Sequence, residues 1–280
     1  MKIIKTIAEL HEVLAPAYDA KQTIGLVPTM GYLHEGHQTL AKAAVAENDI
    51  VVLSDFVNPT QFGPNEDYEA YPRDLARDAR VAEEVGVHYI FAPSVEEMYP
   101  HQGGITFEAG PASNILCGAT RPGHFNGVLQ VVTKLFQIVR PTNAYFGQKD
   151  AQQLAIIQML VRDYNIPVVI RPIPIVREED GLAKSSRNVF LTAEERALAP
   201  QLFATLQTLR KNYEQFDEAA AIQAIETATK GKVDYIQLLS YPDLQPPKAT
   251  DQQLILATAL YYSNVRLIDN IIFEVGEARV

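Results

Sequence analysis

The feature that most constrains the fold is an alternation of short apolar runs and helical segments over residues 1–176. The apolar run Ile24 to Val27 is followed by a loop, by helical spacing through Leu40, and by a β-branched run from Asp49 to Phe56. Strand, helix and strand within about 35 residues is the spacing of a right-handed parallel crossover. Because the alternation continues, the sequence predicts an α/β fold with a doubly wound, Rossmann-like parallel sheet.

The remaining elements of this part are expected from apolar period and turn residues. Further strands are expected at 87–91, 102–109 (an edge strand), 143–146, 168–170 and 173–176. Helices are expected within 1–18 after a short strand, at 72–86 with Pro72 in the first turn, and at 94–98, 127–139 and 150–164. Residues 117–126 are expected to form a polar loop.

The pattern changes near Arg177. A helix is expected from Thr192, because Thr192 and Glu195 have the Thr-x-x-Glu form of a capping box. A second helix at 218–229 precedes three strand-like runs, at 233–239, 254–261 and 265–275. With 280 residues, the chain is long enough for two domains. We therefore predict a first domain at 1–176 and a smaller α+β domain at 177–280.

Composition excludes several classes of function. The balance of 24 basic and 34 acidic residues gives a formal charge of −10, which disfavours a nucleic-acid partner held by bulk electrostatics. No run of 18 apolar residues occurs, so no membrane span is predicted. Cys117 is the only cysteine, which rules out an internal disulfide and predicts a reducing, cytoplasmic location.

The loop after the first buried run is a candidate anion site. His34 and His37 stand three residues apart at an expected helix start, with Gly36 between them. Unpaired N–H groups and the helix dipole at such a terminus attract phosphate. A helix-capping or surface role for the histidines stays open. A zinc site is also conceivable, although six histidines and one cysteine offer few further ligands.

Two other clusters carry positive charge beside small or hydroxyl residues. Gly147-Gln148-Lys149-Asp150 places a lysine where an expected strand passes into a helix, within reach of a polyphosphate. Lys184-Ser185-Ser186-Arg187 combines two cations with two hydroxyls beyond a flexible turn. Each has a plainer interpretation: a capped helix with an exposed lysine for the first, and a solvated charged face for the second.

Several long blocks carry a resemblance to a known family. The HxGH pattern (His34, Gly36, His37) and KSSR resemble the HIGH and KMSKS signatures of the nucleotidyltransferase superfamily. A closer resemblance, to the pantothenate synthetase family, covers PTMGYLHEGH (28–37), FVNPTQFGPNEDYEAYPRD (56–74), RPGHFNGVLQVVTKLFQIVRP (121–141), FGQKDAQQL (146–154) and DGLAKSSRN (180–188). These blocks are ordered and extend over the first two-thirds of the chain.

The resemblance implies an ATP-dependent ligase that condenses (R)-pantoate with β-alanine through a pantoyl-adenylate, releasing AMP and diphosphate, with Mg²⁺ accompanying ATP. It also implies a homodimer. The implied catalytic residues are His34, His37, Lys149, Ser185 and Arg187. The implied ATP site comprises Met30, Gly31, Tyr32, Leu33, His34, Glu35, Gly36, His37, Gly147, Gln148, Lys149, Asp150, Val176, Lys184, Ser185, Ser186 and Arg187.

The implied pantoate site comprises Asn58, Gln61 and Gln153, and Gln61 would also contact β-alanine. Arg121 and His124 lie in a matching block without an assigned role. A cover that excludes water is expected, formed by Gly63 to Tyr71 or by the smaller domain closing over the active site of the first, ATP- and pantoate-binding domain.

Three other functions would use part of the same pattern. A nucleotidyltransferase that moves AMP to a phosphate acceptor would share the HxGH pattern, but the glutamine pair lacks the positive charge such an acceptor favours. A non-enzymatic nucleotide sensor would not need two histidines and two cationic clusters. A tRNA ligase is disfavoured by the charge of −10.

Overall fold

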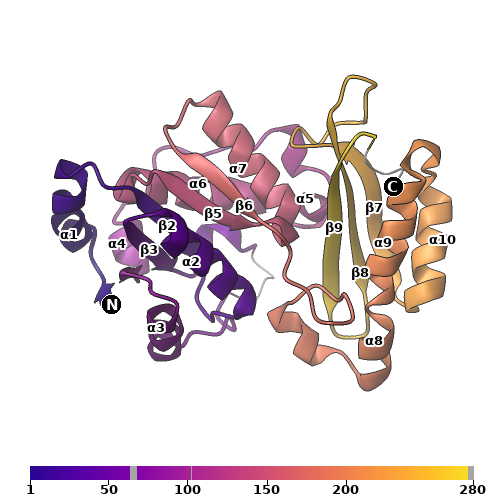
Figure 1. The fold of residues 1–280 in the computed structure, drawn as a ribbon, viewed down its shortest axis with the longest axis horizontal. Helices are drawn as coiled ribbons and strands as arrows, with labels where there is room; N and C mark the ends of the chain where they lie inside the picture. The colour runs from indigo at the N-terminus through magenta and orange to yellow at the C-terminus, as the bar shows by residue number, and fades with distance from the viewer. Residues whose placement is uncertain (64–67, 102, 277–280) are drawn as a thin grey trace. The chain divides into compact units, whose positions relative to one another are not determined.

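The structure is a computed structural model that describes residues 1–63, 68–101 and 103–276. The chain forms two compact units, drawn together in Figure 1. The first, here called the parallel-sheet unit, consists of Met1–Ala109, Arg121–Gln148 and Leu160–Ile173. The second, the antiparallel-sheet unit, consists of Gly110–Thr120, Lys149–Met159 and Pro174–Val280. The predicted fold class, a helix-flanked parallel sheet with a second, smaller α+β domain, is confirmed.

Among the described residues, six parallel strands make the sheet of the first unit. Their order across the sheet is β1-β4-β3-β2-β5-β6. The central strands are short apolar runs with nearly every residue buried, as expected when helices cover both faces of a parallel sheet. The strands are β1 (Lys2–Ile4), β2 (Ile24–Thr29), β3 (Ile50–Asp55), β4 (Tyr89–Phe91), β5 (Asn143–Gly147) and β6 (Val169–Ile173).

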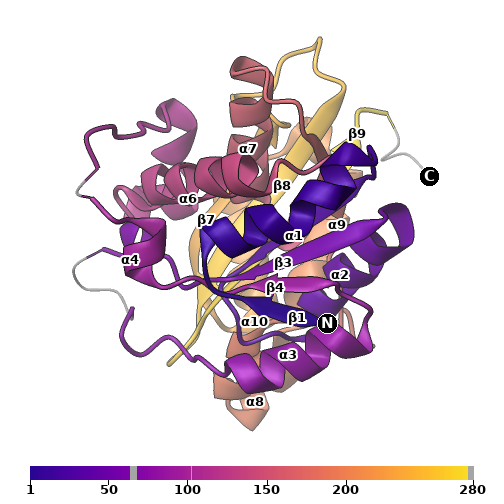
Figure 2. The same cartoon turned by 90° about the vertical axis from the view of Figure 1, so that its left-hand side faces the viewer.

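Helices cover this sheet on both faces, as Figure 2 shows. On one face α2 (Glu35–Glu47) and α3 (Leu75–Glu84) pack over a core of strand and helix side chains that includes Leu33, Leu53 and Ile90. On the other lie α1 (Ile7–Asp19) and α6 (His124–Val139), joined by hydrogen bonds from α1 to the last carbonyls of α6. The remaining elements are α4 (Val95–Met98), η1 (Pro59–Gln61) and α7 (Ala151–Asp163), which runs from the second unit into the first.

The second unit contains an antiparallel sheet of three strands in the order β7-β8-β9 (Figure 1). Helices α9 and α10 pack against it through an apolar core that includes Leu206, Ile225 and Leu256. Its elements are η2 (Pro111–Ser113), α5 (Cys117–Thr120), η3 (Gln148–Asp150, which starts in the first unit), η4 (Ser186–Phe190), α8 (Ala193–Leu198), α9 (Gln201–Lys211), η5 (Tyr213–Gln215), α10 (Glu218–Thr229), β7 (Lys232–Ser240), β8 (Gln253–Tyr261) and β9 (Arg266–Glu274).

Local signals located several boundaries. The capping box at α8 is present, since Thr192 Oγ1 accepts from the N–H of Glu195 and Glu195 accepts from the N–H of Thr192. The helix at 218–229 and the three following strands lie within two residues of their predicted bounds. Among the described residues, no helix has the length and apolar character needed to cross a membrane.

Some predictions of local structure were wrong. Residues 103–109 form no strand, and 102 lies outside the described residues. Helix α3 begins at Leu75 and not at Pro72, because Asp74 caps it by accepting from the N–H of Arg77 at 3.0 Å. The expected loop 117–126 contains the short helix α5 and the first turn of α6. The two extended runs at 168–176 are one strand, β6, followed by coil.

Candidate active site

The candidate residues of the parallel-sheet unit gather at the carboxyl ends of three neighbouring strands. Strands β3, β2 and β5 lie side by side, and Thr29, the last residue of β2, is in register with Asp55, the last residue of β3. The loops that leave these ends begin at Met30, Phe56 and Gln148. Ligands of open parallel sheets bind at this edge, where adjacent loops diverge. The topology therefore brings together three sequence blocks that are far apart along the chain.

The two histidines lie at the N-terminus of α2 with their rings in contact and tilted by 34°. Their ring centroids are 4.0 Å apart. His34 is the N-cap, and its Nδ1 accepts from the N–H of Gly36 at 3.1 Å, while Nδ1 of His37 accepts from the N–H of His34 at 3.3 Å. A neutral imidazole whose Nδ1 accepts carries its proton on Nε2. The backbone thus makes each Nε2 a hydrogen-bond donor beside the positive end of a helix.

The helix-capping role of His34, which the sequence left open, is therefore present: the side chain caps the N-terminus of α2. It does not compete with anion binding, because the cap uses Nδ1 and leaves the proton on Nε2. The loop before the histidines is held in turn by buried groups. Thr29 Oγ1 accepts from the N–H of Gly31 at 3.2 Å, and Asp78 accepts from the N–H groups of Tyr32 and Leu33.

Gln61 lies at the end of η1 in a buried hydrogen-bond network. Its Nε2 is 3.1 Å from the sulfur of Met30, and its Oε1 accepts from Nδ2 of Asn58 at 3.1 Å. Asn58 is 1% exposed; it also donates to the carbonyl of Gly127 at 3.1 Å and accepts from the hydroxyl of Tyr99 at 2.9 Å. Both polar atoms of Asn58 are thus engaged by protein. The network fixes which end of the Gln61 amide is the donor.

Close packing between η1 and α6 makes this network possible. A Cβ added at Gly127 would lie 2.2 Å from the carbonyl oxygen of Thr60, so glycine is required there. His124, at the start of α6, joins the same contact. Arg121 can only donate, so Nε2 of His124 accepts from it at 3.1 Å and Nδ1 donates to the carbonyl of Gln61 at 2.8 Å. Arg121 and His124 therefore hold the backbone of Gln61.

In the antiparallel-sheet unit, β9 holds the backbone of Lys149. Asn270 is 4% exposed, and its Nδ2 donates to the carbonyl of Lys149 at 3.1 Å. Lys149 and Asp150 end η3, and α7 follows directly with half-buried Gln153 in its first turn. The neighbouring Gln152 is buried and donates to two carbonyls of the segment 110–120, which is a structural role.

A hairpin presents the second cationic cluster. The N–H of Lys184 donates to the carbonyl of Val176 at 2.9 Å, and Arg177 forms a β-bridge with Ala183. Arg177 anchors the hairpin to β9 through two bonds to Asp269, at 2.7 and 2.8 Å, and its guanidinium lies 3.5 Å from the ring centroid of Phe203. The sequence had not identified Arg177 or Asp269.

Beyond the hairpin the cluster is at the surface. Ser185 caps η4 by accepting from the N–H of Arg187 at 3.2 Å, and Ser186 and Arg187 are exposed. Lys184 lies 3.8 Å from a carboxylate oxygen of Glu178.

The candidate residues thus divide between the two units. Gathered at the edge of the parallel sheet are Met30, Gly31, Tyr32, Leu33, His34, Glu35, Gly36, His37, Asn58, Gln61, Gly147 and Gln148. The antiparallel-sheet unit carries Lys149, Asp150, Gln153, Val176, Lys184, Ser185, Ser186 and Arg187. Sequence reasoning missed Asp55, Asp78 and Tyr99. In the predicted cover loop, Gly63 to Tyr71, residues 64–67 lie outside the described residues.

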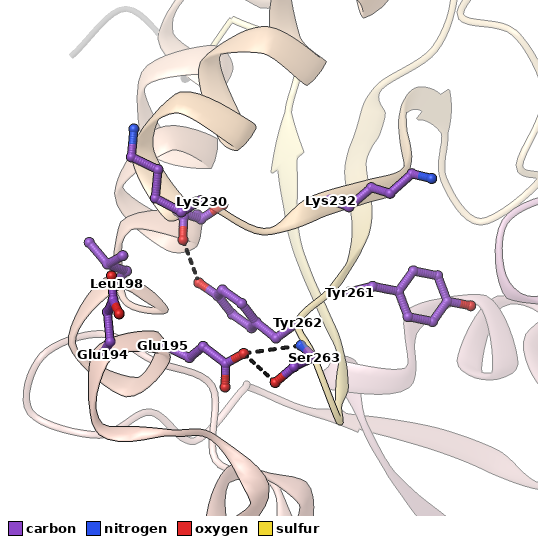
Figure 3. Close-up of a pocket in the computed structure, with 9 residues that line it drawn as sticks. Glu194, Glu195, Leu198, Lys230, Lys232, Tyr261, Tyr262 and Ser263 are labelled. Atoms are coloured by element: carbon purple, nitrogen blue, oxygen red, sulfur yellow. Dashed lines mark hydrogen bonds between the residues drawn. The ribbon is translucent and has the colours of Figure 1, made fainter.

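A pocket of about 450 Å³ in the antiparallel-sheet unit contains none of these residues. Two of its side chains serve local structure: Glu195 accepts from the N–H and hydroxyl of Ser263 (Figure 3), and the hydroxyl of Tyr262 donates to the carbonyl of Thr229. Bonds from Thr192 and Ser263 lower the pKa of Glu195 to about 2. In the described part of the chain, no three His, Cys, Asp or Glu side chains are grouped so that they could hold a metal.

Comparison with protein families places this geometry in context. The family model described as pantoate-beta-alanine ligase matches residues 2–272. The chain is 59% identical to the pantothenate synthetase of Lysinibacillus sphaericus (strain C3-41) over 282 residues, which cover 99% of each protein. It is 54% identical to that of Bacillus thuringiensis subsp. konkukian (strain 97-27), with 98% of this chain and 100% of the relative covered.

Solved structures similar to this chain belong to the same family. A pantothenate synthetase from Thermus thermophilus matches with a TM-score of 0.86 at 44% identity, covering 97% of this chain and 99% of that one. A pantoate-beta-alanine ligase from Francisella tularensis, complexed with beta-gamma ATP and beta-alanine, matches with a TM-score of 0.77 at 37% identity, covering 97% of each.

Proposed function

The chain belongs to the pantoate–β-alanine ligase family of enzymes, and from that premise we propose that it joins (R)-pantoate to β-alanine through a pantoyl-adenylate, releasing AMP and diphosphate. The observation that carries the proposal is the histidine pair at the start of α2, whose Nε2 donors adjoin a helix terminus at the edge of the parallel sheet. The ligands named for the Francisella tularensis structure, ATP and β-alanine, support it.

The first step joins pantoate to AMP. A pantoate carboxylate oxygen attacks the α-phosphorus of ATP, the bond from that phosphorus to the bridging oxygen breaks, and diphosphate leaves with the electron pair. Negative charge grows on the phosphate oxygens, so the step needs preorganised donors more than a strong base. His34 and His37 supply such donors, and ring tautomers fixed by backbone bonds need no reorganisation during the reaction.

The second step transfers the pantoyl group. The neutral amine of β-alanine attacks the carbonyl carbon of the adenylate, the bond to the phosphate oxygen breaks, AMP leaves with the electron pair, and the nitrogen loses a proton. Gln61 suits the pocket for pantoate and β-alanine, because one side-chain amide both donates and accepts. Within it Asn58, held by Tyr99, orients Gln61. We assign Gln153 to pantoate as well.

Lys149, Lys184, Ser185, Ser186 and Arg187 are assigned to the triphosphate, where their charges and hydroxyls stabilise the departing diphosphate. Asp150 is assigned to the ribose, and Val176 with Gly147 and Gln148 to the wall of the nucleotide site. In support, β9 fixes the backbone of Lys149 and the base of the hairpin that precedes Ser185.

Mg²⁺ belongs to the proposal as the ion that accompanies ATP. It keeps several waters and needs few protein ligands when phosphates coordinate it. The described residues, which include no group of three metal-ligating side chains, fit an ion held mainly by the nucleotide. Bound there, Mg²⁺ would neutralise phosphate charge. We further propose a homodimer in the cytoplasm, with 1–176 binding ATP and pantoate and 177–280 closing over the active site.

The deciding experiment is pantoate-dependent exchange of labelled diphosphate into ATP in the absence of β-alanine. An adenylate formed reversibly from pantoate predicts exchange that requires pantoate and stops when it is omitted. Absence of exchange in folded protein that binds ATP would falsify the adenylate mechanism. Exchange supported by a phosphate acceptor in place of pantoate would favour transfer of AMP to that acceptor.

In the same assay, Gln61→Ala should raise the KM for pantoate while leaving the KM for ATP unchanged. Unaltered pantoate kinetics would remove Gln61 from the pantoate site.

A further inference from the structure

Two aspartates from different elements meet beneath the histidine loop, which comprises Met30 to His37. Asp55 is the last residue of β3, and Asp78 lies in the first turn of α3. Asp78 is 0% exposed. Oδ2 of Asp55 is buried and has no hydrogen-bond partner in the described part of the chain. Burial, followed by repulsion from Asp78 and a hydrogen bond to it, raises the pKa of Asp55 to about 6.

Asp78 binds the backbone of the loop directly. Its two oxygens accept from the N–H groups of Tyr32 at 2.6 Å and Leu33 at 2.7 Å, the two residues that precede His34. The adjacent Arg77 completes the contact, because its guanidinium donates to the carbonyl of Leu33 at 2.8 Å and lies 4.8 Å from the ring centroid of Tyr32. The start of α3 therefore holds both peptide groups of Leu33.

Asp55 packs against the same loop at Gly31. An ideal Cβ on Gly31 would lie 2.3 Å from Oδ1 of Asp55 and 3.2 Å from Oδ2 of Asp78. Gly31 also has a φ of +79°, a left-handed conformation that glycine adopts without strain. The loop backbone thus rests on both carboxyl groups. Neither aspartate is among the residues that the family resemblance implies for nucleotide or pantoate binding.

We propose that Asp55 and Asp78 are positioning residues of the ATP site, which hold the backbone from Gly31 to Leu33 so that His34 and His37 meet the phosphates in one orientation. This inference rests on the proposed function, since it assumes that the histidines bind ATP. Asp78 acts as a carboxylate, because it accepts two N–H bonds and lies 3.3 Å from the Arg77 guanidinium. Asp55 supports the backbone at Gly31 best as the neutral acid, because a second negative charge would repel the Asp78 carboxylate.

Asp78→Asn tests the backbone bonds. The asparagine amide has one oxygen and one NH₂ group, so its NH₂ group must face one of the two backbone N–H groups. The hydrogen bond to either Tyr32 or Leu33 is therefore lost. We expect the KM for ATP to rise about tenfold or more, as for other misplaced binding groups, and amide hydrogen exchange at Tyr32 and Leu33 to become faster. An unchanged KM with unchanged exchange would overturn the role of Asp78.

The matched control is Asp74→Ala. Asp74 caps the same helix through the N–H of Arg77 but has no bond to the loop. It should lower the Tm while leaving the KM for ATP unchanged. If Asp74→Ala raises that KM as much as Asp78→Asn does, Asp78 serves only to stabilise α3 and the proposal is wrong.

Asp55→Asn tests the second carboxyl through a pH profile. The charged group that faces Asp55 is Asp78 on α3, whose own partner is Arg77, and every other titratable group of the site is present in both proteins. The ratio of kcat/KM for ATP, variant to wild type, therefore isolates Asp55. We expect a ratio near one below pH 5, rising several-fold above pH 7 as the wild-type carboxyl ionises. A ratio that is constant between pH 5 and 8 would contradict the role of Asp55.

Failure of the proposed function gives a different pattern. A wild-type protein without pantoate-dependent exchange would count against the ligase assignment. ATP binding by calorimetry and hydrogen exchange at Tyr32 and Leu33 would still judge Asp78, because neither needs turnover. Reduced ATP affinity together with faster exchange in Asp78→Asn supports the positioning role in that case too, and normal values of both reject it.

Discussion

Two of the candidate phosphate-binding segments are built in opposite ways. The histidine loop, Met30 to His37, is tied to the sheet edge by side chains that are 0–8% exposed, Thr29 and Asp78 among them. The segment Lys184 to Phe190 lies at the surface, with Val189 79% and Phe190 60% exposed. Donors held by buried groups require no reorganisation during a reaction. Segments with few buried contacts open at a low free energy, which suits a part that must admit substrate.

The segment Lys184 to Phe190 is anchored through the hairpin that precedes it. Adjacent buried residues of β9 hold both cationic stretches of the antiparallel-sheet unit: Asp269 binds Arg177 of the hairpin, and Asn270 binds the carbonyl of Lys149. The comparison therefore separates a loop fixed along its length from a segment fixed only where it begins. The predictions below test this difference.

The largest effect is expected from Arg177→Ala. It leaves Asp269, 3% exposed, as a buried charge without its partner, which should lower the free energy of unfolding by about 3 kcal/mol. Arg196→Ala is the control, since the pair of Arg196 with Asp180 is exposed and should contribute less than about 1 kcal/mol. Urea titration measures both. Equal losses would mean that the hairpin has no special anchor.

Next come the proposed phosphate contacts. His37→Ala and Lys149→Ala should each lower kcat for diphosphate exchange on the order of 10²-fold, as for other lost charge-stabilising donors, with little change in Tm. Lys42→Ala, at an exposed position of α2, controls for lost positive charge. If Arg187→Ala lowers kcat as much as His37→Ala does, the exposed segment is as well organised as the loop.

A glycine pair measures how tightly the loop is packed. Gly31 and Gly123 both have φ of +79°, but an added Cβ meets Asp55 at Gly31 and has no atom within 4 Å at Gly123. Both alanine variants carry a backbone strain of about 1 kcal/mol. Only Gly31→Ala should add a steric cost, seen as a lower Tm and a higher KM for ATP. Identical losses of Tm would show that the loop can move away from Asp55.

The smallest effect is a pH dependence of stability. Because the pKa of Asp55 is raised to about 6 in the folded chain, the folded state binds more protons than the unfolded one between about pH 4 and 6. Stability from this group is present below that window and is lost as the pH rises through it, by on the order of 1 kcal/mol after allowance for partial exposure. Asp55→Asn should abolish the loss, measured by urea titration at several pH values.

Asp49 offers a control of opposite sign. Its bonds from Thr23 lower its pKa, so its contribution is lost as the pH falls. Asp49→Asn should therefore leave the loss between pH 4 and 6 in place.

Much of the fold was predictable because its signals are local. The strand predicted at 24–27, which continues to Thr29 in the structure, the helix after it and the capping box at Thr192 follow from apolar period and neighbouring side chains. Pro72 misled the prediction of α3, because Asp74 forms the cap two residues later. The expected edge strand at 102–109 is absent from 103–109, where an extended segment needs a neighbouring strand to pair with before it becomes part of a sheet.

The supporting residues of the site gave no such signal. Asp78 follows Arg77 in a helix rich in charge and has the pattern of a solvated face, yet it is fully buried. Tyr99 lies 41 residues from Asn58 and has no motif of its own. Arg121 and His124 belong to a matching block, but only the structure shows that they hold the backbone of Gln61.

By itself, the sequence determined the order of strands and helices, the two histidines at a helix start and the family, since each depends on residues close together in the chain. Tertiary structure alone decided that Asp55 and Asp78 meet under Gly31, that Asn58 orients Gln61, and that β9 holds Lys149 and Arg177. Those contacts join residues separated by 23 to 121 positions, except Asn58 and Gln61, whose geometry depends on Gly127 and Tyr99. The burial that makes a polar contact strong arises only when distant segments pack together.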